Sequence, residues 1–162
     1  MWTIYRHTKG LLYIHLGTAL HSESCEPMEI YRALYDNDLA RLWVRPKEMF
    51  HEEVSPGLKR FTEVGRVRIA APDEVPPESP KDPLMRSSMS TNSIGVSHYL
   101  FELPTGERQA EIRVVRLSRG VARIEAESKG EAKQYSSVLI RAVMEIFKCE
   151  DAGMRFVFEG EA

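Results

Sequence analysis

The chain has 162 residues, of which 43% are hydrophobic and 28% are charged, and its formal net charge is −2. This composition is typical of a globular protein, and the length allows one domain or two small ones. The near-neutral charge excludes a global attraction to nucleic acid or to a membrane surface, so binding of either kind needs a local patch. The apolar runs are too short to cross a bilayer.

The two cysteines, Cys25 and Cys149, lie far apart and form no metal-binding or redox spacing. Reduced thiols of this kind fit a cytoplasmic protein. The basic residues near the N-terminus are not followed by an apolar segment with a small-residue cleavage site, so we expect no signal peptide.

Residues 1–70 alternate short apolar runs with polar breaks, which predicts a mainly β domain. In the second predicted strand both side-chain parities are partly apolar, as in a small closed barrel, and Gly17 marks a bend or bulge. We expect a small β-barrel-like domain. Gly10 allows a turn before this strand. We expect strands at residues 2–5, 11–16, 28–35, 39–45, 58–61 and 67–70, and one helical turn at 47–50.

Residues 71–95 are rich in proline and serine and hold almost nothing that could fill a core. Such a segment is typical of a linker or an extended arm.

Residues 96–162 predict a second, α+β unit. Strands at 98–103, 109–117 and 121–127 precede a helix, and a last strand follows at 154–158, so we expect an antiparallel sheet with one helix on its face. Apolar residues at helical spacing define the buried side of that helix: Tyr135, Val138, Leu139, Ala142, Val143, Ile146 and Phe147. A dimer seam is the alternative use of this stripe.

Several spaced motifs in the first part resemble a known family. They are Tyr5-Arg6-His7 with Lys9-Gly10, His21-Ser22-Glu23, Ile30-Tyr31-Arg32-Ala33-Leu34-Tyr35, and Trp43-Val44-Arg45-Pro46 with Glu48-Met49-Phe50. In this order they resemble the bacterial domain-of-unknown-function family 1653 over about residues 4–63. The resemblance implies a compact, small-barrel β domain and carries no activity with it.

Polar residues at strand ends and in loops of this part are the candidate ligand-binding set. Arginine offers a planar fork to phosphate or carboxylate, lysine adds a point charge, and aromatic rings stack on bases. The predicted binding residues are Arg6, His7, Lys9, Tyr13, His21, Tyr31, Trp43 and Arg45. In the alternative interpretation the arginines pair with Glu23 or Glu48 and the aromatic residues fill the core.

Catalytic and metal-binding chemistry has weak support. His7, His15 and His21 with Glu23 match no standard metal spacing, and adjacent residues on an extended chain point to opposite faces. The chain contains no Gly-x-Ser-x-Gly elbow, phosphate loop or Gly-x-Gly-x-x-Gly motif. We therefore expect no catalytic residue, no metal and no cofactor, with a hydrolase using His21 and Glu23 as the weakest alternative.

A second basic run lies in the predicted hairpin of the C-terminal unit. Arg113 and Arg123 share one strand parity, and Arg119 sits at the turn. They could form a cationic face, although glutamates on the same face could neutralise it by cross-strand pairing.

Taken together, the sequence predicts a non-enzymatic binding module for a phosphate-bearing ligand, either nucleic acid or a nucleotide-type small molecule. The alternative is a protein-interaction or oligomer-forming protein that uses residues 71–95 and the C-terminal unit. Neither interpretation involves a membrane.

Overall fold

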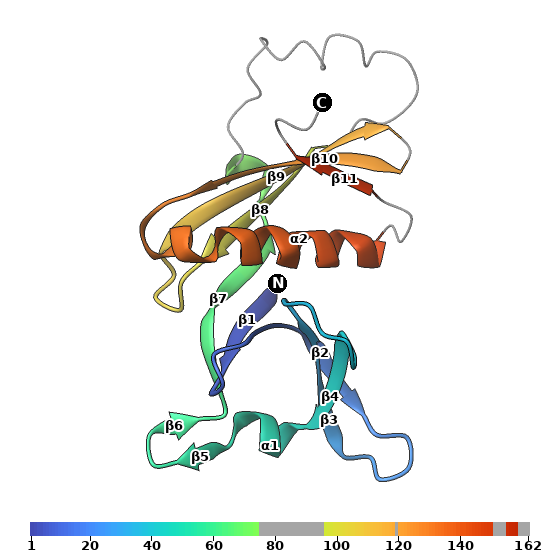
Figure 1. The fold of residues 1–162 in the computed structure, drawn as a ribbon, viewed down its shortest axis with the longest axis vertical. Coiled ribbons are helices and arrows are strands. Elements are labelled where there is room, and N and C mark those ends of the chain that lie inside the picture. Colours follow the sequence, from blue (N-terminus) through green and yellow to red (C-terminus); the bar gives the residue numbers. More distant parts are fainter. Residues whose placement is uncertain (75–95, 119, 151–154, 159–162) are drawn as a thin grey trace. The chain divides into compact units, whose positions relative to one another are not determined.

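The computed structural model describes residues 1–74, 96–118, 120–150 and 155–158 (Figure 1). The chain divides into two compact units. The first comprises Met1–Val67 with Phe101–Arg108, and the second comprises Arg68–Leu100 with Gln109–Ala162. Of the predicted linker, residues 75–95 lie outside the described residues. Only its start is described, where Pro72–Glu74 forms a 3₁₀ turn.

The first unit is mainly β. Its strands and helix are β1 (Trp2–His7), β2 (Leu12–Leu20), β3 (Pro27–Ala33), β4 (Leu42–Pro46), α1 (Lys47–His51), β5 (Glu53–Ser55), β6 (Leu58–Lys59) and β7 (Phe61–Ile69). Five of these strands pair antiparallel in the order β7-β1-β2-β3-β4, and β5 and β6 form a separate hairpin. The helical turn and the turn at Gly10, which has a φ of 85°, are confirmed.

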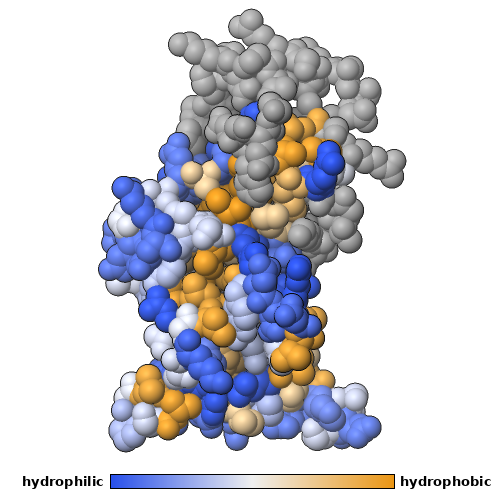
Figure 2. Space-filling model, in the orientation of Figure 1, coloured by the Kyte–Doolittle hydropathy of each residue, from blue (hydrophilic) through white to orange (hydrophobic). Residues whose placement is uncertain are grey.

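This sheet is strongly curved, and α1 with the β5–β6 hairpin connects the end of β4 to the start of β7 (Figure 1). The unit is therefore barrel-like only in a loose sense. It is not a closed barrel, because no pairing joins β4 to β7 among the described strands. Figure 2 shows hydrophobic surface over the β5–β6 hairpin, where Val54 and Leu58 are exposed.

One strand prediction in this unit was wrong. Residues 61–69 form the single strand β7 instead of contributing to two short strands, and Leu58 belongs to the separate strand β6. The polar residues Thr62 and Arg66 occupy exposed positions of a strand whose Phe61 and Val67 are buried. Pairing with β1 extends from Phe61 to Val67 and so bridges the two predicted segments.

The bulge expected at Gly17 is confirmed, because the pairing of β2 with β3 shifts between His15 and Gly17. Gly17 has a φ of 146°, a conformation that side-chain-bearing residues rarely adopt. A bulge adds one residue to one strand, so beyond the bulge each side chain of that strand lies on the opposite face of the sheet from the one that regular alternation would give it.

The second unit has the predicted β-β-β-α-β order. Its elements are β8 (Val96–Glu102), β9 (Arg108–Ser118), β10 (Val121–Ser128), the 3₁₀ helix η3 (Gly130–Tyr135), α2 (Ser136–Glu150) and β11 (Arg155–Phe158). The last two residues of β8, Phe101 and Glu102, and the first residue of β9 belong to the first unit. The strand order is β11-β10-β9-β8. The expected antiparallel pairing is present between β9 and β10, whereas β11 pairs parallel to β10. Helix α2 follows β10 in the chain and returns toward the start of that strand. The next strand, β11, can therefore run parallel to β10.

The predicted apolar stripe of α2 is buried at Leu139, Ala142, Val143 and Ile146. The helix covers one face of the sheet (Figure 1). The buried residues of β9 and β10 on one strand parity are Ala110, Ile112, Val114, Ala122 and Ile124. This packing confirms the α+β assignment.

Among the described residues, no helix has the length and apolar character needed to cross a membrane.

A close backbone contact in the first unit gives a stability prediction. A Cβ at Gly65 of β7 would lie 2.5 Å from the ring of Phe101 and from the carbonyl oxygen of Glu102. We expect Gly65→Ala to destabilise this unit by about 1–3 kcal/mol, because a buried aromatic ring and backbone must move to admit the methyl group. Urea unfolding should show the loss, whereas Thr62→Ala at an exposed position of the same strand should change stability by less than about 0.5 kcal/mol. Equal stability of the two variants would contradict the contact.

Candidate functional site

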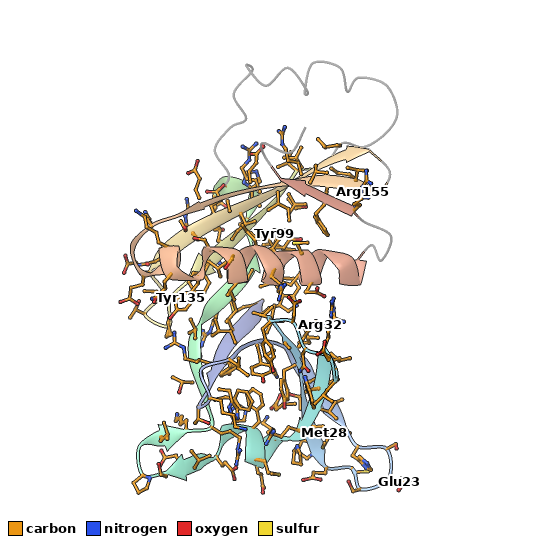
Figure 3. The ribbon with its side chains drawn as sticks, viewed as in Figure 1. Glu23, Met28, Arg32, Tyr99, Tyr135 and Arg155 are labelled. Atoms are coloured by element: carbon orange, nitrogen blue, oxygen red, sulfur yellow. The ribbon has the colours of Figure 1, made fainter. Side chains whose placement is uncertain are left out.

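One face of the curved sheet in the first unit, which we call the aromatic face, carries most of the candidate residues. Strand register places side chains from five strands there, because Tyr5 pairs with Tyr13, His15 with Tyr31, Tyr31 with Trp43, Glu29 with Arg45, and His7 with Phe61. Phe50 of α1 packs onto the same face. Figure 3 shows side chains filling the space between the curved strands and α1.

The centre of the aromatic face is a packed core. The rings of Phe50 and Phe61 stack with centroids 4.1 Å apart and an interplanar angle of 7°. Tyr31 is buried against both rings, and Tyr13 and Trp43 are half-buried at the edge. The core interpretation thus describes Tyr31 well, while Tyr13 and Trp43 keep part of their surface in solvent.

Arg45 lies over this core. Its Nε donates a hydrogen bond to the Tyr31 hydroxyl at 3.3 Å, and its guanidinium carbon lies 5.9 Å from the centre of the Phe61 ring. In the described part of the chain, no carboxylate lies within ion-pair distance of Arg45. A half-buried arginine therefore keeps its terminal N–H groups for another acceptor.

His7 stands at the edge of the same cluster, with its ring centre 4.8 Å from that of Phe61 and 6.5 Å from that of Tyr13. Its Nδ1 accepts the backbone N–H of Lys9 at 3.1 Å, so the neutral ring carries its proton on Nε2. Burial and the charges of Arg45, Arg60 and Lys9 lower the pKa of His7 below its ordinary value. His7 is thus a neutral N–H donor at pH 7, surrounded by cations.

Two further cations differ in availability. Arg60, which the sequence analysis did not single out, forms an ion pair with Glu52, and its Nε donates to the same carboxylate oxygen at 2.7 Å. Lys9 is exposed in the β1–β2 turn, and no carboxylate among the described residues pairs with it.

The hydroxyl groups of Tyr13 and Tyr35 share a hydrogen bond of 2.6 Å. Burial together with this partner raises the pKa of Tyr13.

The structure does not bring all predicted residues to this face. Arg6 lies between Tyr5 and His7 in β1, so its side chain projects from the opposite face of the sheet. His21 is exposed in the turn after β2, where its Nδ1 accepts the backbone N–H groups of Glu23 and Ser24. Figure 3 shows Glu23 at the tip of that turn.

The sequence analysis missed a buried carboxylate on the aromatic face. Glu29 of β3 is only 2% exposed, and both of its oxygens have partners. Oε2 accepts hydrogen bonds from His15 Nε2 at 2.5 Å and from the Thr18 hydroxyl at 2.8 Å. Oε1 lies 3.4 Å from His51 Nε2 and 3.9 Å from Lys47 Nζ, both on α1.

The bulge at Gly17 makes this network possible. His15 and Thr18 are three residues apart, so in a regular strand they would face opposite sides. The extra residue lets His15 pair with Tyr31 and Thr18 with Glu29, and both side chains reach the same oxygen. Strand alternation in β3 could have placed Glu29 on the side of Tyr31, but its partners depend on this bulge.

Burial raises the pKa of Glu29. The hydrogen bonds from His15 and Thr18, the charge of His15 and the hydrogen bond from His51 outweigh that effect, so the pKa lies below its ordinary value. Glu29 is therefore ionised at neutral pH.

Among the described residues, no group of three or more His, Cys, Asp or Glu side chains is placed to hold a metal ion.

Comparison with known families gives one result. Residues 3–63 match the family "Protein of unknown function (DUF1653)". The match runs from β1 to the start of β7 and so contains every residue of the aromatic face. A search of curated proteins and a search of solved structures found no match. The family thus covers the candidate site and leaves its ligand open.

Two arginines of the second basic run share one carboxylate. Glu125 pairs with Arg113 through Oε2 and with Arg123 through Oε1, both at 2.8 Å. Arg119 lies outside the described residues. This arrangement favours the solvated, charge-paired face over a surface that attracts nucleic acid.

The network around Glu29 predicts a pH-dependent stability. Because the pKa of Glu29 is lower in the folded than in the unfolded chain, the stabilisation is fully present above the unfolded value of about 4.3 and is lost as pH falls through the folded value. Glu29→Gln places an amide N–H₂ group among hydrogen-bond donors. We therefore expect the free energy of unfolding to fall by about 1–3 kcal/mol at pH 7, and to depend less on pH below 4.5. Chemical unfolding between pH 3 and pH 7 measures both effects.

Glu26→Gln, at an exposed position in the preceding turn, is the control for this variant. It should leave both stability and its pH dependence unchanged. If Glu29→Gln behaves like Glu26→Gln, the buried carboxylate does not stabilise the fold.

Proposed function

We propose that the first unit is a non-enzymatic binding module for a phosphate-bearing ligand, and that Arg45 is its main anion contact. The observation that carries this proposal is the guanidinium of Arg45, which is fixed by Tyr31 and Phe61 and has no carboxylate partner among the described residues. An arginine held in one orientation recognises phosphate oxygens with two parallel N–H donors. Its preorganisation lowers the entropy lost on binding.

Groups around Arg45 extend the same chemistry. Lys9 adds a second, exposed positive charge near His7, and His7 offers a neutral N–H through Nε2. A neutral donor suits a site already surrounded by cations, because it binds a phosphate oxygen without adding repulsion.

The aromatic surround supports a ligand that also has a flat, partly polar group. Tyr13 and Trp43 are half-buried at the edge of the core. A nucleobase would supply a stacking face for the exposed parts of these rings.

The distribution of charge favours a nucleotide-type small molecule over nucleic acid. Of the cations that lie around His7, Arg45 and Lys9 lack a carboxylate partner among the described residues, while Arg60 is paired with Glu52. Two charges match one phosphate monoester, whereas nucleic-acid binding requires a row of cations along several phosphates. The paired arginines of β9 and β10 provide no such row.

The test is isothermal titration with adenosine 5′-monophosphate, inorganic phosphate and a single-stranded oligonucleotide. We expect the mononucleotide to bind, with an affinity that decreases as salt is raised, and Arg45→Ala to weaken it by about tenfold or more, since a charge-assisted hydrogen bond contributes about 1.5–3 kcal/mol. Arg45→Lys should restore only part of the loss, because lysine cannot form the two-pronged contact.

Arg66→Ala is the matched control, because Arg66 belongs to the same unit but already pairs with Glu63 at 2.8 Å. This variant should bind like the native protein. Tight binding of the oligonucleotide with none of the mononucleotide would favour nucleic acid as the ligand. Absence of binding to all three probes, or equal effects of the two alanine variants, would refute the proposal.

A further inference from the structure

Glu29 and Arg45 make an unusual pair. They are direct cross-strand neighbours in the pairing of β3 with β4, and both side chains lie on the aromatic face. Opposite charges in this relation lie about 5 Å apart at Cβ and normally attract each other. Here the two do not form an ion pair, and Arg45 turns to Tyr31 instead.

The reason lies in the partners of the carboxylate. His15 and Thr18 occupy Oε2, and two residues of α1 approach Oε1. A carboxylate that is saturated by four neighbours gains little from a fifth, so Arg45 loses little by facing away.

His15 is the strongest of these partners. Its contact of 2.5 Å is the shortest, and its side chain is 24% exposed, compared with 48% for His51 and 51% for Lys47. The ring is also fixed by neighbours, with centroids 6.1 Å from Tyr5 and 5.9 Å from Phe50. Less solvent and a fixed ring make this hydrogen bond less easily replaced by water.

We propose that His15 is a positioning residue for the binding site: by holding the Glu29 carboxylate, it prevents Glu29 from neutralising Arg45 and keeps the guanidinium available to an anionic ligand. This inference rests on the proposed function for its consequence in binding. The competition between His15 and Arg45 for Glu29 is a property of the free protein and can be measured without ligand.

Removal of the imidazole leaves Oε2 of Glu29 with Thr18 as its remaining donor and frees one acceptor position of this oxygen beside Arg45. The guanidinium of Arg45 then exchanges its hydrogen bond with Tyr31 for an ion pair with Glu29, which attracts it more strongly than a neutral hydroxyl does. This pair adds a negative charge to the site and occupies the N–H donors that a phosphate needs. The loss of binding therefore comes from Glu29, and removing that charge as well should reverse it.

The experiment compares His15→Leu, His15→Gln and the double variant His15→Leu/Glu29→Gln in titrations with adenosine 5′-monophosphate. We expect His15→Leu to weaken binding by about tenfold, as for the loss of one charge-assisted contact. His15→Gln keeps a donor for Glu29 and should bind within about threefold of the native protein. The double variant should regain most of the affinity, which a purely structural defect at His15 would not allow.

A second measurement needs no ligand. The Nε–Hε resonance of Arg45 in the free protein should shift in His15→Leu and return in the double variant. An unshifted resonance together with native affinity in His15→Leu would overturn the inference. If His15→Leu does not fold, Thr18→Val removes the other donor to Oε2 and should shift the same resonance in the same direction, by less; no shift there overturns the inference as well. If the native protein binds no nucleotide while the resonance shifts as expected, the proposed function fails and the positioning role of His15 stands.

Discussion

The first unit depends on one costly feature, the buried carboxylate of Glu29. An ionised carboxylate without partners in a protein interior costs several kcal/mol, so such a group is stable only when hydrogen-bond donors surround it. Its donors come from β2, through His15 and Thr18, and from α1, through His51 and Lys47. The register of β2 and the position of α1 must therefore be correct together, which ties three elements to one side chain.

The same constraint shapes the electrostatics of the candidate site. The chain as a whole is slightly acidic, yet the aromatic face presents Arg45 without a carboxylate partner among the described residues. This is possible because the acidic neighbour of Arg45 is already satisfied. Local charge at a site is thus decided by which groups pair with each other, and net charge gives no guide to it.

Much of the fold could be predicted from local patterns. Such patterns depend only on residues close together in the sequence. Examples are the alternating apolar residues, the glycines at positions 10 and 17, and the helical spacing from Leu139 to Ile146. The site was harder to predict from the sequence, because its contacts join residues that are distant along the chain. Glu29 bonds His15, which is 14 positions away, and His51, which is 22 positions away. Arg6 shows the opposite case, since strand alternation alone separates it from His7, and grouping the two by adjacency ignored that signal.

Tyr31 both packs in the core and orients the proposed anion contact. Its ring fills the core against Phe50 and Phe61, while its hydroxyl orients Arg45. Phenylalanine at this position would keep the packing and lose the hydrogen bond that fixes the guanidinium. Tyrosine satisfies both requirements, because its apolar ring can be buried while its hydroxyl stays at the polar edge of the cluster. Tyr31 is therefore a core residue that also orients Arg45, the proposed anion contact.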